Sequence, residues 1–366
     1  MTDLSKLKVA ITHDWLVGGG AEKVVLELHH MFPDAPIYTS YATDEWRKKL
    51  DNKVVTGWLQ HFGKLRKFMV LPRIWWFEHL DLSEYDLVIS SSGNGEAFAV
   101  KTHKNTLHVN YCHSPTHYYW RHYDQYVREP GFGVFNPVVR TALKLLLSPL
   151  RKWDYKAAQR ADVMIANSSH IQADIRRYYD RESTVIFPPV DTKPFQETSS
   201  QSRNGFLVLG RQVPQKRQIL AVEACTNLGL PLTVVGSGPE NSRLRTAAGP
   251  SVSFDTDASD QDVRQYMANS QAFLFCGTDD FGIAPVEAMA AGTPVIAYKA
   301  GGALDYVQPG ITGEFFEENS SESLSQVLSA FDSSKYSPDG IKRASNKFSI
   351  VSFHKTLQDL LNSAIQ

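Results

Sequence analysis

The stretch TDDFGIAPVEAMAAGTPVIAY (residues 278–298) contains a loop, an apolar helix and a strand in close succession. The apolar run AFLFC (272–276) precedes it and is typical of a buried strand. Pro285 stands where the first turn of a helix tolerates proline, and the β-branched run PVIAY (294–298) follows. A strand, a helix and a second strand in this order predict one unit of a parallel α/β sheet.

The same alternation continues in both directions along the chain. Short β-branched runs with helical stretches between them predict parallel strands joined by crossover helices. A polar segment, residues 191–204, is rich in Ser, Gln and charge and has the composition of an exposed interdomain linker. The predicted strands are 8–13, 36–40, 86–92, 106–112, 162–168 and 184–187 before this segment, and 206–210, 232–236, 252–254, 272–276 and 294–298 after it.

These patterns predict an α/β fold of two doubly wound, Rossmann-like domains. The N-terminal domain spans residues 1–190 and the C-terminal domain spans residues 191–348. A helical pattern over about 349–366 is expected to cross back onto the first domain. In open parallel sheets, ligands bind outside the carboxyl ends of the strands, so functional side chains are expected in the loops that follow the strands.

Composition narrows the class of protein. The chain has 366 residues with 38 Lys and Arg against 39 Asp and Glu, so its net charge is close to zero. This balance argues against a broad nucleic-acid-binding face, which would be basic, and against an acidic tail. No apolar run approaches the ~18 residues of a membrane span, and the N-terminus does not resemble a secretion signal, so a cytoplasmic location is expected. Cys112, Cys225 and Cys276 lack CxxC spacing and are expected to be small buried hydrophobic residues.

The loop before the helix that contains Pro285 predicts a nucleotide site. Asp279 and Glu287 stand eight residues apart, where Asp279 could reach a sugar hydroxyl and Glu287 could accept hydrogen bonds from ribose hydroxyls. Backbone N–H groups at a helix N-terminus favour phosphate. The residues of this helix start are Phe281, Gly282, Ile283 and Ala284.

Two further loops of the C-terminal half suit a diphosphate. Arg211 directly follows a strand, and Lys216 comes five residues later, across a turn that Pro214 stiffens. Each charge-assisted hydrogen bond to phosphate contributes about 1.5–3 kcal/mol, whereas an exposed ion pair contributes about 0–1 kcal/mol. The next strand ends in a turn with Gly236 and Gly238, which is either a nucleotide-facing loop or an ordinary strand–helix turn.

Consecutive glycines follow the first strand. Gly18, Gly19 and Gly20 precede an amphipathic helix, where backbone N–H groups can approach an anion. The GxGxxG spacing of dehydrogenases is absent, and the second strand ends without an acidic residue, which argues against a nicotinamide site. A structural tight turn is the alternative.

The segment CHSPTHYYWRHYDQY (112–126) follows another strand. His113 and the aromatic residues near it could line a ligand, with a packing role as the alternative. Pro115 separates His113 from His117 and disfavours the helix that a zinc site of HExxH type requires, so no metal is expected.

Two basic and apolar segments, 64–77 and 138–153, have the composition of interfacial membrane-binding segments. Amphipathic core helices with basic outer faces would explain the same composition. The residues predicted to meet the membrane are Lys64, Arg66, Lys67, Arg73, Trp75 and Trp76.

Taken together, the glycine loop, His113 in CHSP, Arg211 with Lys216, the VGSG turn and the acid-x7-Glu element resemble family 4 retaining glycosyltransferases. The resemblance extends over nearly the whole chain. It implies a GT-B fold, in which two Rossmann-like domains face each other across a cleft. It also implies phosphate binding by Arg211 and Lys216, ribose binding by Glu287, and sugar contacts by Asp279 and His113; this chain has Asp279 where the family usually has Glu.

Within the family, the segments 280–307 and 165–191 resemble mannosyltransferases that build lipid-linked polysaccharides from GDP-mannose. The implied function is transfer of mannose, with retention, to a hydroxyl of a lipid-linked or glycan acceptor at the cytoplasmic membrane face, without a cofactor. Arg211 and Lys216 would stabilise the departing phosphate without a metal. A UDP- or dTDP-sugar donor, a sugar-nucleotide epimerase and a non-enzymatic binding module are the alternatives.

Overall fold

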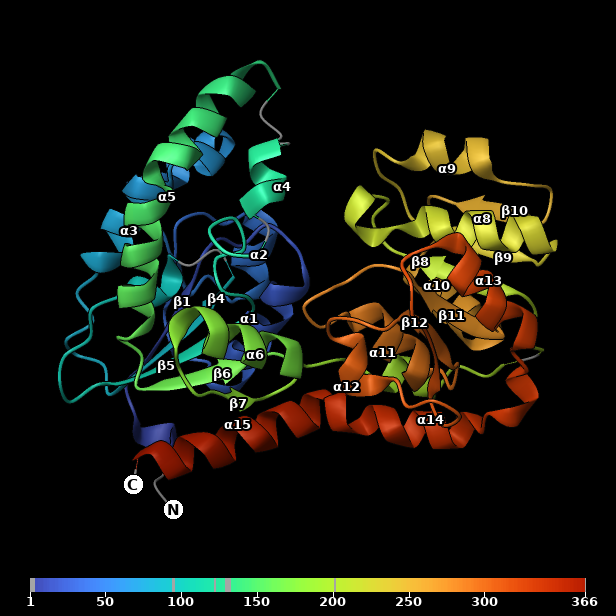
Figure 1. The fold of residues 1–366 in the computed structure, drawn as a ribbon. Helices are drawn as coiled ribbons and strands as arrows, with labels where there is room; N and C mark the ends of the chain where they lie inside the picture. The colour runs from blue at the N-terminus through green and yellow to red at the C-terminus, as the bar shows by residue number, and fades with distance from the viewer. Residues whose placement is uncertain (1–3, 94–95, 122, 129–132, 201, 366) are drawn as a thin grey trace. The chain divides into compact units, whose positions relative to one another are not determined.

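The computed structural model describes residues 4–93, 96–121, 123–128, 133–200 and 202–365. The chain divides into two compact units, Met1–Pro188 with His354–Gln366, and Pro189–Phe353. Each unit is built on one parallel sheet with helices on both faces (Figure 1). The predicted α/β fold with two doubly wound domains is confirmed.

The first unit contains a seven-stranded sheet in the order β3-β2-β1-β4-β5-β6-β7. The chain runs outward from β1 to β3 and then returns to the other side of β1, so the order reverses between β1 and β4. Ligands bind at such a switch point in open α/β sheets. The strands are β1 (Val9–His13), β2 (Ile37–Thr39), β3 (Val54–Val55), β4 (Leu87–Ser92), β5 (Leu107–Cys112), β6 (Val163–Ala166) and β7 (Thr184–Val185).

Apolar side chains from the helices and strands of this unit form its core. One cluster joins Trp76 and Phe77 of α3 to Ala10 of β1 and Val88 of β4. Another joins Ile171 and other residues of α6 to α5 and β6. The helices are η1 (Leu4–Lys6), α1 (Gly20–Met31), α2 (Asp44–Lys49), η2 (Trp58–Phe68), α3 (Val70–Glu78), η3 (Ala97–Ala99), α4 (Tyr123–Arg128), η4 (Gly133–Phe135), α5 (Asn136–Ala158) and α6 (Ser169–Tyr179).

The second unit contains a six-stranded sheet in the order β10-β9-β8-β11-β12-β13. Its switch point lies between β8 and β11, the first strand of the unit and the strand that precedes the 278–298 stretch. The buried residues of β11 explain its central position, since every residue from Ala272 to Phe275 is covered. The strands are β8 (Phe206–Leu209), β9 (Leu232–Val235), β10 (Val252–Asp255), β11 (Ala272–Phe275), β12 (Val295–Tyr298) and β13 (Gly313–Phe316).

Two groups of helices cover this sheet. Helix α8 contacts both α9 and α13, and apolar side chains of these helices join the sheet core around Phe206 and Leu274. Helices α7, α10, α11 and α14 form the other group. The helices are α7 (Lys193–Gln196), η5 (Pro214–Lys216), α8 (Gln218–Leu228), α9 (Asn241–Ala247), α10 (Asp260–Asn269), α11 (Ile283–Ala290), α12 (Ala303–Tyr306), α13 (Ser321–Ala330), η6 (Ser333–Lys335), α14 (Pro338–Ser345), η7 (Asn346–Phe348) and α15 (Ile350–Ile365).

The structure differs from the predicted organisation in three places. Two strands were not predicted: β3 is only two residues long (VV), and β13 has the sequence GEFF, which contains no β-branched residue. The 191–204 segment contains α7, which contacts α10 and α11 of the second unit, so the prediction of a bare exposed linker was wrong there. The units meet in sequence at Pro188 and Pro189, whereas the predicted boundary followed residue 190.

The three cysteines are buried, as expected, and none forms a disulfide. Among the described residues, no helix has the length and hydropathy needed to cross a bilayer.

Candidate functional site

The loop after β8 carries both cations of the predicted diphosphate site. Arg211 is exposed, and within the described part of the chain its guanidinium makes no ion pair. Lys216 ends the short helix η5 and is partly buried. Arg217 follows in a left-handed conformation with φ of 48°, which ends η5 and begins α8. The turn therefore places two cations of different exposure at the carboxyl end of the central strand β8.

Gln212, which the sequence did not single out, connects this loop to the loop after β9. Its buried amide donates from Nε2 to the carbonyl oxygen of Gly236 at 2.7 Å and accepts at Oε1 from Asn241 Nδ2 at 2.8 Å. Its backbone N–H donates to the carbonyl oxygen of Ser237 at 2.8 Å. A side chain at Gly238 would overlap the Gln212 carbonyl group, and φ there is 154°. The VGSG turn is thus held against the cation loop by a fully buried amide.

Lys216 meets Asp279 across the switch point between β8 and β11. The Lys216 ammonium donates to Asp279 Oδ2, with side-chain exposures of 32% and 24%. Gly277 allows the approach, since a Cβ there would lie 2.9 Å from the Gln215 carbonyl oxygen. A partly exposed pair of this kind contributes about 0–1 kcal/mol, so an incoming anion can compete with Asp279 for the lysine.

Helix α11 begins where the 278–298 stretch predicted. Gly282 caps it with φ of 89°, and no side chain caps the first turn. Its N-terminal N–H groups are therefore available to a phosphate oxygen. Ile283, Ala284 and Glu287 are partly buried, and Glu287 lies on the second turn of the same helix. The structure brings this helix start and the Lys216–Asp279 pair to one end of the sheet.

Phe281, which precedes the start of α11, packs into the core of the second unit. Its side chain is buried against Tyr306 at 5.8 Å and Phe348 at 5.6 Å between ring centroids. The backbone around it is fixed because Gly302 N–H donates to the Asp279 carbonyl oxygen at 3.0 Å. The Phe281 side chain is therefore part of the core, so a contact of this residue with the donor would have to come from its backbone.

In the first unit, the glycine loop already holds a carboxylate. Glu22 Oε1 accepts from Gly18 N–H at 2.9 Å and from Val17 N–H at 3.3 Å. Gly19 and Gly20 are exposed at the start of α1. The loop thus has the geometry of an anion cradle, and an incoming anion would compete with Glu22 for its N–H groups.

His113 lies at the carboxyl end of β5 and is 9% exposed. Its Nε2 lies 2.8 Å from the hydroxyl of Ser91 on β4, and the same hydroxyl lies 3.2 Å from Nδ1 of His13 on β1. Burial, together with a smaller contribution from the neighbouring His13, lowers the pKa of His113 to about 3. His113 is therefore a neutral imidazole at physiological pH.

A buried ion pair lies at the same end of this sheet. Arg73 of α3 donates to Glu96 Oε1 at 2.6 Å, and Tyr118 donates to the same oxygen at 3.3 Å. Asp14 accepts from the backbone N–H groups of Gly93 at 2.8 Å and of Ala97. Burial raises the pKa of Glu96 to about 7, although the Arg73 guanidinium lowers it.

The residues predicted to meet the membrane therefore differ in their exposure. Arg73 is buried against Glu96 and Trp76 lies in the core beside Phe77, so their assignment to a membrane surface was wrong. Trp75 is 53% exposed. The side chains of Lys64, Arg66 and Lys67 lie outside the described part of the structure.

Two of the aromatic residues after His113, Tyr119 and Trp120, pack within the first unit. Tyr119 is fully buried. Trp120 stacks on Tyr178 with centroids 5.2 Å apart and donates to Asp154 at 2.7 Å. Tyr118 contacts Glu96. Tyr119 is too deeply buried to line a sugar ring, so the first interpretation was wrong for this residue. Packing, the alternative, describes both Tyr119 and Trp120.

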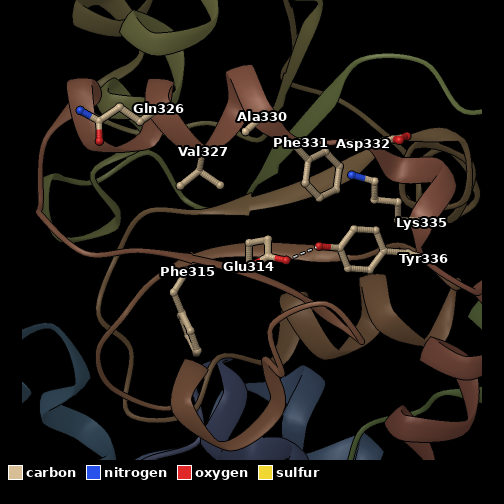
Figure 2. Close-up of a pocket in the computed structure, with 9 residues that line it drawn as sticks. All are labelled: Glu314, Phe315, Gln326, Val327, Ala330, Phe331, Asp332, Lys335 and Tyr336. Atoms are coloured by element: carbon tan, nitrogen blue, oxygen red, sulfur yellow. Dashed lines mark hydrogen bonds between the residues drawn. The ribbon is translucent and has the colours of Figure 1, made fainter.

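Two further kinds of site were considered: a metal site and a pocket away from the switch points. Among those residues, no group of three His, Cys, Asp or Glu side chains could hold a metal ion. A pocket of about 420 Å³ lies on edge strand β13, which β12 separates from β11. Figure 2 shows its lining, with Tyr336 donating to Glu314 and the Phe331 ring near Tyr336. No predicted site residue lines this pocket.

Two family models match the chain. Residues 18–194 match Glycosyltransferase Family 4, and residues 189–347 match Glycosyl transferases group 1. A GDP-Man:Man(3)GlcNAc(2)-PP-Dol alpha-1,2-mannosyltransferase of Xenopus laevis is 27% identical over 179 residues. That alignment covers 41% of this chain and 36% of the relative, so it spans about a third of the relative's length.

Solved structures of similar fold cover nearly all of the chain. HepE of Anabaena in complex with UDP-glucose has a TM-score of 0.69 and 20% identity, covering 98% of this chain and 100% of HepE. Sucrose-phosphate synthase of Thermosynechococcus elongatus has a TM-score of 0.67 and 15% identity, covering 98% and 99%. With two glycosyltransferase family models over residues 18–347 and these structural neighbours, the chain is a family 4-like glycosyltransferase with the GT-B fold.

Proposed function

We propose that the protein transfers mannose from GDP-mannose, with retention, to a hydroxyl group of a lipid-linked or glycan acceptor. The second unit would hold the nucleotide sugar and the first unit would present the acceptor. The observation that carries the proposal is the convergence of Arg211, Lys216 and the uncapped start of α11 at the switch point of the second sheet. The partial match to a mannosyltransferase supports mannose as the sugar.

In this mechanism the bond between the sugar C1 and the diphosphate oxygen breaks, and a bond forms between C1 and the acceptor oxygen. Arg211 and Lys216 stabilise the negative charge that develops on the diphosphate. The departing phosphate oxygen accepts the acceptor's proton, so no protein base is required. Glu287 would accept from ribose hydroxyls, and the N–H groups of Gly282, Ile283 and Ala284 would contact a phosphate.

Asp279 and His113 would contact the donor sugar. Asp279 is paired with Lys216 in the structure, so competition of the diphosphate for the lysine would release this carboxylate toward the sugar hydroxyls. This exchange offers a use for Asp279, whose side chain is one methylene shorter than the Glu of related proteins. Gly19 and Gly20 would allow close approach of an anion to the backbone. Gly236 and Gly238 would act indirectly, because they let the loop after β9 pack against the carbonyl groups of Gly210 and Gln212.

Thermal unfolding in the presence of a panel of nucleotide sugars tests the donor. Saturating GDP-mannose is expected to raise Tm, and a ligand at 100 times its Kd stabilises by about 2.7 kcal/mol. UDP-glucose, the ligand of Anabaena HepE, and a dTDP-sugar serve as competitors, and a larger shift with either would replace GDP-mannose as the donor. A donor-only incubation detects the epimerase alternative, and the absence of a shift with every donor contradicts nucleotide-sugar binding.

We also propose peripheral binding to the cytoplasmic membrane face, through a surface that we call the α5 surface. It comprises Val134, Phe135, Val138, Leu145 and Leu146 of η4 and α5, all exposed. Helix α3 lies beside α5, joined by the Trp153–Glu78 hydrogen bond at 3.0 Å, and adds exposed Leu71 and Trp75 (Figure 1).

The charges of α5 suit an anionic lipid surface. Lys144, Lys152 and Lys156 are exposed, whereas its one acidic residue, Asp154, is buried. Each cation near an anionic bilayer contributes about 1 kcal/mol. The apolar and basic side chains together have the composition of an interfacial helix.

Substitution Leu145→Glu is expected to weaken binding to phosphatidylglycerol-containing vesicles about tenfold or more, because a buried leucine contributes about 1.5–3 kcal/mol. Vesicle sedimentation measures the bound fraction. Ile311→Glu, at an exposed apolar residue of the second unit, is the matched control and should leave binding unchanged. Equal binding by Leu145→Glu and the unsubstituted protein would exclude the α5 surface.

A further inference from the structure

His113 belongs to a chain of three side chains at the switch point of the first sheet. His13 ends β1, Ser91 lies near the end of β4, and His113 follows β5. The strand order places β4 between β1 and β5, so Ser91 lies between the two imidazoles. The rings of His13 and His113 are nearly perpendicular, with centroids 6.3 Å apart. The arrangement decides which nitrogen of each ring carries a proton.

The assignment starts at His13. Its Nδ1 lies 2.8 Å from the backbone carbonyl oxygen of Ser91 and 3.2 Å from the Ser91 hydroxyl oxygen. A carbonyl oxygen only accepts hydrogen bonds, so His13 Nδ1 must carry the proton. Because His13 Nδ1 is protonated, it cannot accept a hydrogen bond from the Ser91 hydroxyl.

The remaining neighbour of the Ser91 hydroxyl is Nε2 of His113, at 2.8 Å. If His113 Nε2 carried the proton, the buried Ser91 O–H group would have no acceptor among the described residues, and a buried donor without an acceptor destabilises the folded protein. The Ser91 hydroxyl thus donates to Nε2. A neutral His113 then carries its proton on Nδ1, which has no protein partner in the described part of the structure.

We infer that Ser91 and His13 are positioning residues that hold His113 as the Nδ1–H tautomer, so that His113 is a hydrogen-bond donor to a substrate oxygen rather than a general base. The inference rests on the proposed function only for the identity of that oxygen, a sugar hydroxyl or phosphate oxygen of the donor. The basic nitrogen of His113 is occupied by Ser91, so it cannot take a proton from substrate. This fits a mechanism in which the departing phosphate, and not the protein, removes the acceptor's proton.

The tautomer can be measured without enzyme activity. Long-range proton–nitrogen correlation spectra of the full-length ¹⁵N-labelled protein distinguish a protonated ring nitrogen from an unprotonated one, and loss of signals in His113→Asn identifies the His113 ring. The expected pattern is a protonated Nδ1 and an unprotonated Nε2. In Ser91→Ala the pattern should change toward the Nε2–H form or a mixture, whereas Ser92→Ala, in the adjacent strand position, should leave it unchanged. A protonated Nε2 in the unsubstituted protein would overturn the inference.

Kinetics provide a second readout. Ser91→Ala is expected to lower kcat about tenfold, the loss of one hydrogen bond of ordinary strength, and Ser91→Thr should restore most of it. His113→Asn places an amide N–H near the former Nδ1 position, whereas His113→Gln places it near Nε2. The asparagine variant should therefore retain more activity than the glutamine variant, and equal loss in both would contradict a donor role. Should no nucleotide sugar be turned over, the proposed function fails while the tautomer measurement still decides the inference.

Discussion

Substitution Lys216→Ala is expected to lower kcat about 30- to 150-fold, since the ammonium group stabilises developing charge on the departing diphosphate by roughly 2–3 kcal/mol. The effect should fall on kcat, because a further negative charge develops on the diphosphate in the transition state, and also on KM for the donor, because the bound diphosphate is already anionic. Steady-state assays with GDP-mannose and an acceptor measure it. Lys335→Ala, an exposed lysine on η6, is the matched control and should retain full activity.

The Lys216–Asp279 ion pair sharpens this prediction. Removal of the lysine alone leaves the Asp279 carboxylate at the diphosphate position without its cation, which adds repulsion to the loss of attraction. The double variant Lys216→Ala/Asp279→Asn should therefore bind the donor more tightly than Lys216→Ala, although the catalytic loss persists. Unchanged turnover in Lys216→Ala would exclude the lysine as leaving-group catalyst.

Much of the fold and part of the site could be predicted because they are encoded locally. The strands carry β-branched runs, and Gly282 with Pro285 marks the start of α11. Contacts between distant segments leave no such pattern. Nothing in the letters GRQVP indicates that Gln212 reaches the β9 loop, or that Lys216 meets Asp279 63 residues later.

The error at Arg73 has the same origin. A segment with lysines, arginines and tryptophans resembles an interfacial helix until its three-dimensional neighbours are known. Glu96, 23 residues later, neutralises Arg73 in the interior, and the Trp15 ring lies 4.7 Å from the guanidinium. The run of three serines at the end of β4 is a sequence feature that could have indicated a polar site, because polar residues are unusual in a buried central strand. One of these serines, Ser91, contacts and orients His113.

Substitution Arg73→Met is expected to destabilise the first unit by about 3–5 kcal/mol, because it leaves the Glu96 carboxylate buried without its cation. At about 2–4 °C per kcal/mol for a unit of this size, Tm should fall by roughly 6–20 °C. Calorimetry or urea unfolding measures the change. Arg176→Met is the matched control: Arg176 pairs with Glu182 on the surface, 3.4 Å apart, and its loss should cost less than about 1 kcal/mol.

The pH dependence of that loss identifies its cause. Burial raises the pKa of folded Glu96 to about 7 from the ordinary value of 4.5, so the folded state retains a proton that the unfolded state releases between these values. Stability therefore decreases as pH rises through this range. Removal of the Arg73 cation raises the pKa of folded Glu96 further and extends the decrease in stability to higher pH.

The loss of stability in Arg73→Met should thus be smaller at pH 5.5 than at pH 8. At pH 8 the buried carboxylate either ionises without its cation or keeps its proton against the pH, and both lower the free energy of unfolding. In the double variant Arg73→Met/Glu96→Gln no carboxylate remains at this position. The difference in stability between the two pH values should therefore vanish, and part of the lost stability should return. If the stability deficit of Arg73→Met were instead equal at both pH values, lost packing around Trp15, and not an unpaired buried charge, would account for it.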